Sequence, residues 1–492
     1  WATQYKIDGF RFDLMGHHMK SNMVNLRAML DGLTLEKDGV DGKSIYVYGE
    51  GWDFGEVAKN ARGTNGTQVN MAGTGIGTFN DRLRDAVRGG GPFSGFQDQG
   101  FATGLVDSPN GTDQGSPDKQ RTDMLQYTAW IQAGLAGNLK DYPLINEAGE
   151  TVLAGDINYR GAPTGYNAEP QEHIVYVSAH DNETLFDAIQ AKAPADAPLS
   201  ERVRMHNLAM SIVALAQGVP FFHAGDDLLR SKSLDRNSYN SSDWFNRIDW
   251  TGKENTWGSG LPPAGDNQEK WPLIKPLLAD SKLKPTDTDM AAAEANFLEM
   301  VQIRKSSPLF RLQTADQVKQ VVSFGNTGAN QILGMIVMNL DDTSAKLDPT
   351  YDRIVVFFNG TNKTQTYSDA KFANAAFTLH PVQDESVDYV VSTATFDSAS
   401  GAFSIPARST IVFVQAEGNA SATPVPAVQA TATAAPASTP ASDATAVPAA
   451  TPQATPAPAS STSNRGIWFA IAAGALLVAG AAIGWLRRKP QE

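Results

Sequence analysis

Three short apolar segments, each ending in ionisable side chains, constrain the fold of this chain more than any other feature. They are residues 7–12, followed by Asp13; residues 45–49, followed by Glu50; and residues 174–178, followed by His180 and Asp181. Each segment is rich in β-branched or aromatic residues and precedes a helix-like stretch, which is the pattern of an α/β protein with a parallel sheet. The carboxyl ends of such strands share one edge, where (β/α)₈ enzymes keep their catalytic groups. The sequence therefore predicts that these side chains meet.

Arg11 and Asp13 lie two residues apart, so on a strand their side chains point the same way. A neighbouring guanidinium keeps a carboxylate ionised, which suits a nucleophile, although the pair alone is equally compatible with a buried ion pair that only supports the fold. Glu50 and the His180–Asp181 pair add what glycoside hydrolysis requires, namely a second carboxyl group and further groups that hold sugar hydroxyls. Together the three segments favour a glycosidase.

Five stretches carry a family resemblance. They are DGFRFDLMGHH from Asp8, YGEGWDFGEV from Tyr48, YVSAHDNETLFD from Tyr176, GIGTFNDRLRDAVRGGGPF from Gly75, and VPFFHAGDDLLRSKSLDRNSYNSSDWFNRIDW from Val219. On these motifs the chain resembles the α-amylase superfamily of glycoside hydrolases, and within it the pullulanase-type debranching enzymes (limit dextrinases). The resemblance covers roughly residues 1–415.

The resemblance implies a catalytic role for each ionisable residue at the three strand ends. Asp13 would be the nucleophile, Glu50 the general acid and base, and Asp181 the transition-state stabiliser. Arg11 would hold Asp13 charged and oriented, and His180 would bind hydroxyls of the sugar at the cleavage point. We expect a retaining mechanism, in which the two carboxyl groups lie roughly 5–5.5 Å apart.

The resemblance also implies binding residues and a substrate. Trp52 would stack on a glucosyl unit, unless it is a core tryptophan, and Asp235 and Arg236 would contact the non-reducing side of the substrate. The expected reaction is hydrolysis of α-1,6 branch links in pullulan, limit dextrins and related α-glucans. The alternatives are an α-1,4-acting amylase or neopullulanase, and a non-catalytic surface protein that binds glycans.

The fold implied for residues 1–307 is α/β, a partial (β/α)₈ barrel made of barrel strands 4–8. The expected strands are residues 7–12, 45–49, 135–139, 174–178 and 219–223. The family's strand that ends in an Asn-His pair has no match, and the chain opens inside a motif. We therefore expect a C-terminal fragment of a longer enzyme, inactive by itself.

Short alternating runs separated by turn residues follow, which predicts an all-β sandwich over residues 308–416. Its expected strands are residues 318–324, 331–338, 353–359, 386–392 and 410–415. Residues 417–464 are almost entirely Ala, Thr, Pro, Ser and Val, a composition that predicts a disordered stalk.

An uncharged stretch at residues 466–486 is long enough to cross a bilayer, and its tryptophans Trp468 and Trp485 lie near the two ends. Arg487, Arg488 and Lys489 then begin a basic tail, residues 487–492, which favours the cytoplasmic side. The sequence predicts a cell-surface protein anchored by one C-terminal transmembrane helix, with its folded part outside.

The formal net charge of −13 argues against a nucleic-acid partner, and the chain has no cysteine for a disulfide or a thiol nucleophile. A neutral α-glucan is the expected substrate, and the chemistry requires no cofactor. A structural calcium ion is compatible with the resemblance, but the sequence identifies no metal ligands. It also leaves the oligomeric state open.

Overall fold

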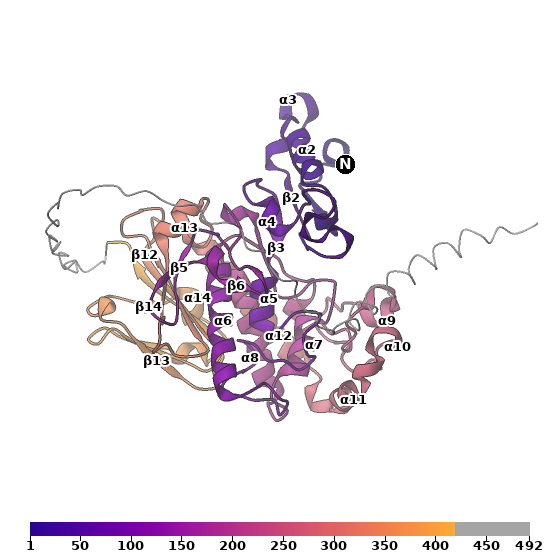
Figure 1. Ribbon diagram of the computed structural model, residues 1–492. Coiled ribbons are helices and arrows are strands. Elements are labelled where there is room, and N and C mark those ends of the chain that lie inside the picture. The colour runs from indigo at the N-terminus through magenta and orange to yellow at the C-terminus, as the bar shows by residue number, and fades with distance from the viewer. Residues whose placement is uncertain (419–492) are drawn as a thin grey trace, which may run out of the picture. The chain divides into compact units, whose positions relative to one another are not determined.

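The computed structural model describes residues 1–418, and its first half is built on a parallel sheet (Figure 1). The strand order is β1-β2-β3-β8-β9, and every neighbouring pair is parallel. The strands are β1 (Gly9–Phe12), β2 (Tyr46–Gly49), β3 (Gly77–Phe79), β8 (His173–Val175) and β9 (Val219–Pro220). The expected α/β architecture is therefore present, with its carboxyl ends along one edge.

The prediction of a strand at residues 135–139 was wrong. Leu135 ends helix α6 (Pro117–Leu135), and the middle strand of the sheet is β3 instead. β3 is only three residues long and is buried throughout. Asn80 follows it at once and caps α5 (Asp81–Arg88) by accepting hydrogen bonds from the backbone N–H groups of Arg82 and Leu83. A strand of three residues that begins with a glycine and ends at a helix cap is too short to show alternating polar and apolar side chains. The sequence pattern therefore did not predict it.

Helices connect the strands of this sheet and continue into the rest of the described chain. The longer ones, besides α5 and α6, are α2 (Lys20–Asp31), α7 (Leu185–Lys192), α8 (Leu199–Leu215), α11 (Trp271–Ala279) and α12 (Asp287–Ser306). The shorter ones are α1 (Ala2–Tyr5), α3 (Leu35–Asp38), α4 (Gln68–Met71), α9 (Ser242–Asn246), α10 (Ala264–Asn267), α13 (Ala315–Val321) and α14 (Pro381–Asp384). Two small hairpins, β4 (Pro143–Ile145) with β5 (Thr151–Leu153) and β6 (Asn158–Tyr159) with β7 (Ala162–Pro163), follow α6.

The last part of the described chain contains two antiparallel sheets, of order β10-β11-β12-β17-β14 and β13-β16-β15. Their strands are β10 (Val322–Gly325), β11 (Met335–Asp341), β12 (Tyr351–Asn359), β13 (Gln365–Ser368), β14 (Thr378–Leu379), β15 (Thr395–Asp397), β16 (Ala402–Ile405) and β17 (Ser409–Ala416). A shared core that includes Phe357, Phe403 and Phe413 joins the two sheets. The two sheets form the expected sandwich.

The predicted strands at 353–359 and 410–415 lie within β12 and β17, and those at 318–324 and 331–338 overlap β10 and β11 only in part. The predicted strand at 386–392 was wrong. Residues 318–324 are mostly helix α13, and only the end of the segment belongs to β10. Residues 386–392 form no strand, because the alternating side chains Val387 and Tyr389 face solvent, 81% and 78% exposed. Alternation predicts a strand only where one of the two faces is buried.

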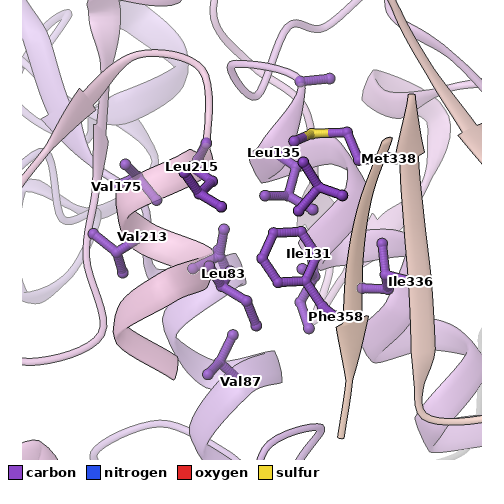
Figure 2. Packing of buried hydrophobic residues seen from close by; sticks show 14 of the residues in the cluster. Leu83, Val87, Ile131, Leu135, Val175, Val213, Leu215, Ile336, Met338 and Phe358 are labelled. Atoms are coloured by element: carbon purple, nitrogen blue, oxygen red, sulfur yellow. The ribbon is translucent and has the colours of Figure 1, made fainter. Parts of the chain in front are cut away.

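One hydrophobic core joins the helices to the first antiparallel sheet (Figure 2). In the close-up, the side chains of α5, α6 and α8 point toward those of β11 and β12. The labelled residues are Leu83, Val87, Ile131, Leu135, Val175, Val213, Leu215, Ile336, Met338 and Phe358. Residues on both sides of the predicted boundary at 307/308 therefore share one core, and the described residues belong to a single compact unit.

The predicted stalk from residue 419 onward, the predicted transmembrane segment 466–486 and the tail 487–492 lie outside the described residues. Within residues 1–418, none of the helices combines the length and the apolar composition needed to cross a membrane.

Removing a side chain from the shared core is expected to destabilise the protein. Phe358 is fully buried, so Phe358→Ala should lower the free energy of unfolding by about 3–5 kcal/mol through lost burial and the cavity left behind. Phe93 is 98% exposed, so Phe93→Ala, the matched control, should change it by at most about 0.5 kcal/mol. Urea unfolding of the two variants measures the difference; equal midpoints would contradict the shared core.

Candidate active site

The register of the first two strands brings Asp13 and Glu50 together. β1 and β2 pair Phe12 with Gly49, so the next residue of each strand emerges at the same edge. The backbone N–H of Glu50 donates to the carbonyl of Phe12 over 3.0 Å. A side chain at Gly49 would place its Cβ 2.5 Å from that same carbonyl oxygen, so the approach of the strands requires glycine there.

Arg11 joins the two carboxylates. Its Nη1 donates to Asp13 Oδ1 over 3.1 Å, and its Nη2 donates to Glu50 Oε1 over 2.7 Å. The Asp13 side chain is 64% exposed, whereas that of Glu50 is only 8% exposed. One cation therefore holds an open carboxylate and an enclosed carboxyl group next to each other.

His180 and Asp181 complete the cluster from the loop after β8. His180 Nε2 lies 3.8 Å from Asp13 Oδ1 and 3.4 Å from Asp181 Oδ1, and its Nδ1 lies 3.4 Å from Arg11 Nη2. Asp181 is 62% exposed, so its carboxylate is accessible to a ligand. The structure thus brings Arg11, Asp13, Glu50, His180 and Asp181 to one place, at the carboxyl ends of strands far apart in sequence.

The environment of Glu50 favours its protonated form. Burial raises its pKa above the usual value of a glutamate, while the backbone N–H of Leu14 and the charge of Arg11 lower it and the charges of Asp13 and Asp181 raise it further. The Leu14 N–H donates to Glu50 Oε2 over 2.9 Å. The net effect is a raised pKa, which is what a general acid needs.

Leu14 makes this contact from an unusual backbone conformation. Its φ of +48° lies in the left-handed region, which a leucine rarely adopts. Such conformations are found where the surrounding structure holds them, often at functional sites. Here it directs the N–H of Leu14 toward the carboxyl group of Glu50.

These residues also have the spacing of metal ligands. One oxygen each of Asp13 and Glu50 and one nitrogen of His180 lie within 4.8 Å of one another, and this is the one such cluster found among residues 1–418. The guanidinium of Arg11 already contacts all three side chains. A cation in that position repels a metal ion, so the cluster does not suit one. This cluster therefore does not provide ligands for the calcium ion that the family resemblance allows.

The remaining predicted residues make their hydrogen bonds and ring contacts with other groups, and Trp52 packs in the same aromatic cluster as Phe79. Trp52 is half-buried, with the Arg84 guanidinium carbon 6.0 Å from its ring. Asp235 is fully buried and accepts hydrogen bonds from Asn237 N and Asn267 Nδ2, each over 3.0 Å. Arg236 Nη2 donates to the carbonyl of Pro92 over 3.0 Å. Within residues 1–418, no hydrogen bond or ion pair joins these three residues to the side chains of Asp13, Glu50, His180 or Asp181.

Sequence reasoning missed two residues that support the cluster. Lys232 is buried, and its Nζ donates to the backbone carbonyl of His180 over 3.2 Å. Phe79, on β3, lies beneath Arg11, with the guanidinium carbon 5.6 Å from the ring centre. The helix cap at Asn80 would have revealed the strand that carries Phe79, whereas no pattern in the sequence marks Lys232.

A family model and two relatives show what the chain is similar to. A family model described as alpha-1,6-glucosidases, pullulanase-type, C-terminal matches residues 252–416. The chloroplastic Pullulanase 1 of Arabidopsis thaliana is 50% identical over 422 residues, which cover 84% of this chain and 44% of that protein. Pullulanase of Klebsiella pneumoniae is 37% identical over 433 residues, 87% of this chain and 38% of that protein.

A solved structure gives the same result. The maltotriose complex of PulA from Klebsiella pneumoniae matches with a TM-score of 0.78 and 39% identity, over 85% of this chain and 44% of that one. The chain thus spans less than half the length of these relatives. Identity over most of this chain, a shared fold and the family model agree, and the chain belongs to the pullulanase-type α-1,6-glucosidase family.

Proposed function

We propose that the protein containing this chain is a retaining glycoside hydrolase that cleaves α-1,6 links in pullulan and related branched α-glucans. The observation that carries the proposal is the Arg11 guanidinium bound to two carboxyl groups of opposite exposure. The oxygens of Asp13 and Glu50 lie within 4.8 Å, which supports the ~5–5.5 Å carboxyl separation of a retaining enzyme over the ~6.5–9.5 Å of an inverting one.

In the proposed reaction, Asp13 attacks the anomeric carbon while Glu50 gives its proton to the leaving glycosidic oxygen. A covalent glycosyl ester forms on Asp13, and the aglycone departs with the proton. Glu50, now ionised, removes a proton from water, which attacks the same carbon and releases Asp13. Asp181 and His180 hold the hydroxyls of the reacting sugar, and Arg11 orients the Asp13 carboxylate through their 3.1 Å contact.

The choice of α-1,6 links rests on the relatives, which are named pullulanases, and on the solved relative that holds maltotriose. The full-length protein should therefore release maltotriose from pullulan with the α-anomer retained. Chromatography of the products and NMR of the fresh reducing ends measure both points. Release of panose, or the β-anomer, would overturn the linkage or the mechanism.

We also propose that β1, β2, β3, β8 and β9 are strands 4–8 of a (β/α)₈ barrel completed by chain outside this sequence. The support is their parallel order and the chain's share of its relatives, 44% or less. The cleft of such a barrel lies at the carboxyl ends of its strands. Trp52 would stack on a sugar there, and Asp235 and Arg236 would shape the non-reducing side.

Removing the nucleophile should abolish turnover. In the full-length protein, Asp13→Asn should lower kcat on pullulan by about 10³-fold or more, because no ester can form. Glucan binding should change little, since the amide has the same shape, and affinity electrophoresis in pullulan gels measures this. Turnover near that of the wild type would exclude Asp13 as the nucleophile.

Glu50→Gln should lower turnover on pullulan by about 10²–10⁴-fold, because the leaving oxygen then receives no proton. Burial raises the pKa of Glu50, so in the wild type the acid stays protonated above the pH at which an exposed glutamate ionises. The wild-type kcat/KM should fall as pH rises through that raised pKa. With an activated aryl glycoside, the variant should still cleave the bond at a rate near that of the wild type, and its rate should no longer fall at high pH. If the rate of the variant still fell at high pH, the general acid would be a residue other than Glu50.

We further propose, from sequence alone, that residues 466–486 anchor the protein in a membrane with its folded part outside the cell. Ending the full-length chain after Ser463 should then release active enzyme with unchanged kcat and KM. Fractionation and protease treatment of intact cells measure this. Recovery of the full-length protein in the cytosol would contradict the anchor and its orientation.

A further inference from the structure

A pocket of about 460 Å³, open to solvent, adjoins the candidate active site. Its lining includes Asn182, the residue after Asp181, and Arg84, whose guanidinium lies against Trp52. The loop at residues 90–96, the start of the segment after α5, forms one wall.

The charge of this pocket contrasts with that of the chain. Four cations line it, Arg84, Arg88, Lys192 and Lys270, against one carboxylate, Glu183, although the chain as a whole carries −13. Burial lowers the pKa of Lys192 to about 8, and the neighbouring charge of Arg88 lowers it too. Burial and then the charge of Arg236 lower the pKa of Lys270. The pocket therefore holds more positive charge than its own carboxylate balances. A neutral glucan has no negative charge that could balance the rest.

Three of the four cations have structural partners. Arg84 pairs with Asp85 over 2.7 Å, and Arg88 pairs with Glu183 over 3.7 Å, so these carboxylates offset the two guanidinium charges. Lys192 Nζ donates to the carbonyls of Gly89 and Asp98, which orient the ammonium group but do not cancel its charge. Lys192 therefore places a positive field behind the pocket.

Lys270 is different. Among the described residues, its ammonium group has no hydrogen bond or ion pair. The ammonium nitrogen lies over the ring of Phe96, 5.1 Å from the ring centre. The ammonium group of Lys270 is half-buried and lies on an aromatic face near other positive charge. It is therefore available to bind an anion.

We propose that this pocket binds a phosphoryl group, held by Lys270 and by the field of Lys192. Four cations less the two carboxylates Asp85 and Glu183 leave two positive charges, which suit a phosphoryl dianion better than a single carboxylate. The group has two possible sources, inorganic phosphate or a phosphomonoester on a sugar of the glucan near the cleavage point. The second source rests on the proposed function, whereas the first does not.

Binding is tested first with inorganic phosphate on the full-length protein, by titration calorimetry. Lys270→Met should weaken phosphate binding about tenfold, whereas Lys270→Arg should keep most of the affinity. Lys275→Met is the matched control, because Lys275 lies over the ring of Trp271 at 5.7 Å but does not line the pocket. Its phosphate affinity should equal that of the wild type.

The glucan arm compares an α-glucan carrying phosphomonoesters with the same glucan after phosphatase treatment. A fall of about tenfold in the ratio of their kcat/KM values in Lys270→Met identifies the glucan phosphomonoester as the source. An unchanged ratio, with phosphate binding still lost, identifies free phosphate. No phosphate binding by the wild type, or equal affinity in Lys270→Met, overturns the proposal. Because calorimetry needs no turnover, an inactive protein that binds phosphate would contradict only the proposed function.

Discussion

The guanidinium of Arg11 is the contact on which the site depends. It binds Asp13 beside it on β1, Glu50 at the end of β2, and the ring of His180 from the loop after β8. Without this charge, the neighbouring carboxyl groups of Asp13 and Glu50 would repel each other when ionised and would separate. With it, one carboxylate stays open to solvent while its neighbour, Glu50, is enclosed, and burial raises the pKa of Glu50.

The sheet gives that contact a rigid base. Phe79 of β3 lies beneath Arg11 and packs edge-on against Tyr176 and Phe221, at ring-centre distances of 5.1 and 5.0 Å. These rings come from segments that end at the same edge. A layer of aromatic side chains has few accessible rotamers and excludes water, so it restricts where the guanidinium can move. The position of the charge is thus set by apolar packing as much as by its ionic partners.

How far the sequence predicted this arrangement depended on the kind of signal. Asp13, Glu50, His180 and Asp181 could be placed together because each follows a strand with clear side-chain preferences, and parallel strands share one edge. The strand β3 was missed because three buried residues next to a glycine carry no periodicity. Alternation misled at residues 386–392, where the side chains of Val387 and Tyr389 face solvent. Lys232 escaped because its contact with His180 is made to a backbone carbonyl, which no side-chain pattern encodes.

The hydrogen bond from Leu14 to Glu50 has a consequence for how this site changes over evolution. Its donor is a backbone N–H, so no side-chain substitution at position 14 removes it directly. What position 14 does control is the left-handed conformation, which glycine and asparagine adopt more readily than leucine. Drift toward either residue would relax the chain and keep the donor, whereas a β-branched residue would oppose it. Most substitutions of Leu14 therefore leave the pKa of Glu50 unchanged, and adaptation to a new working pH has to come from the burial of Glu50 or from the charged groups around it.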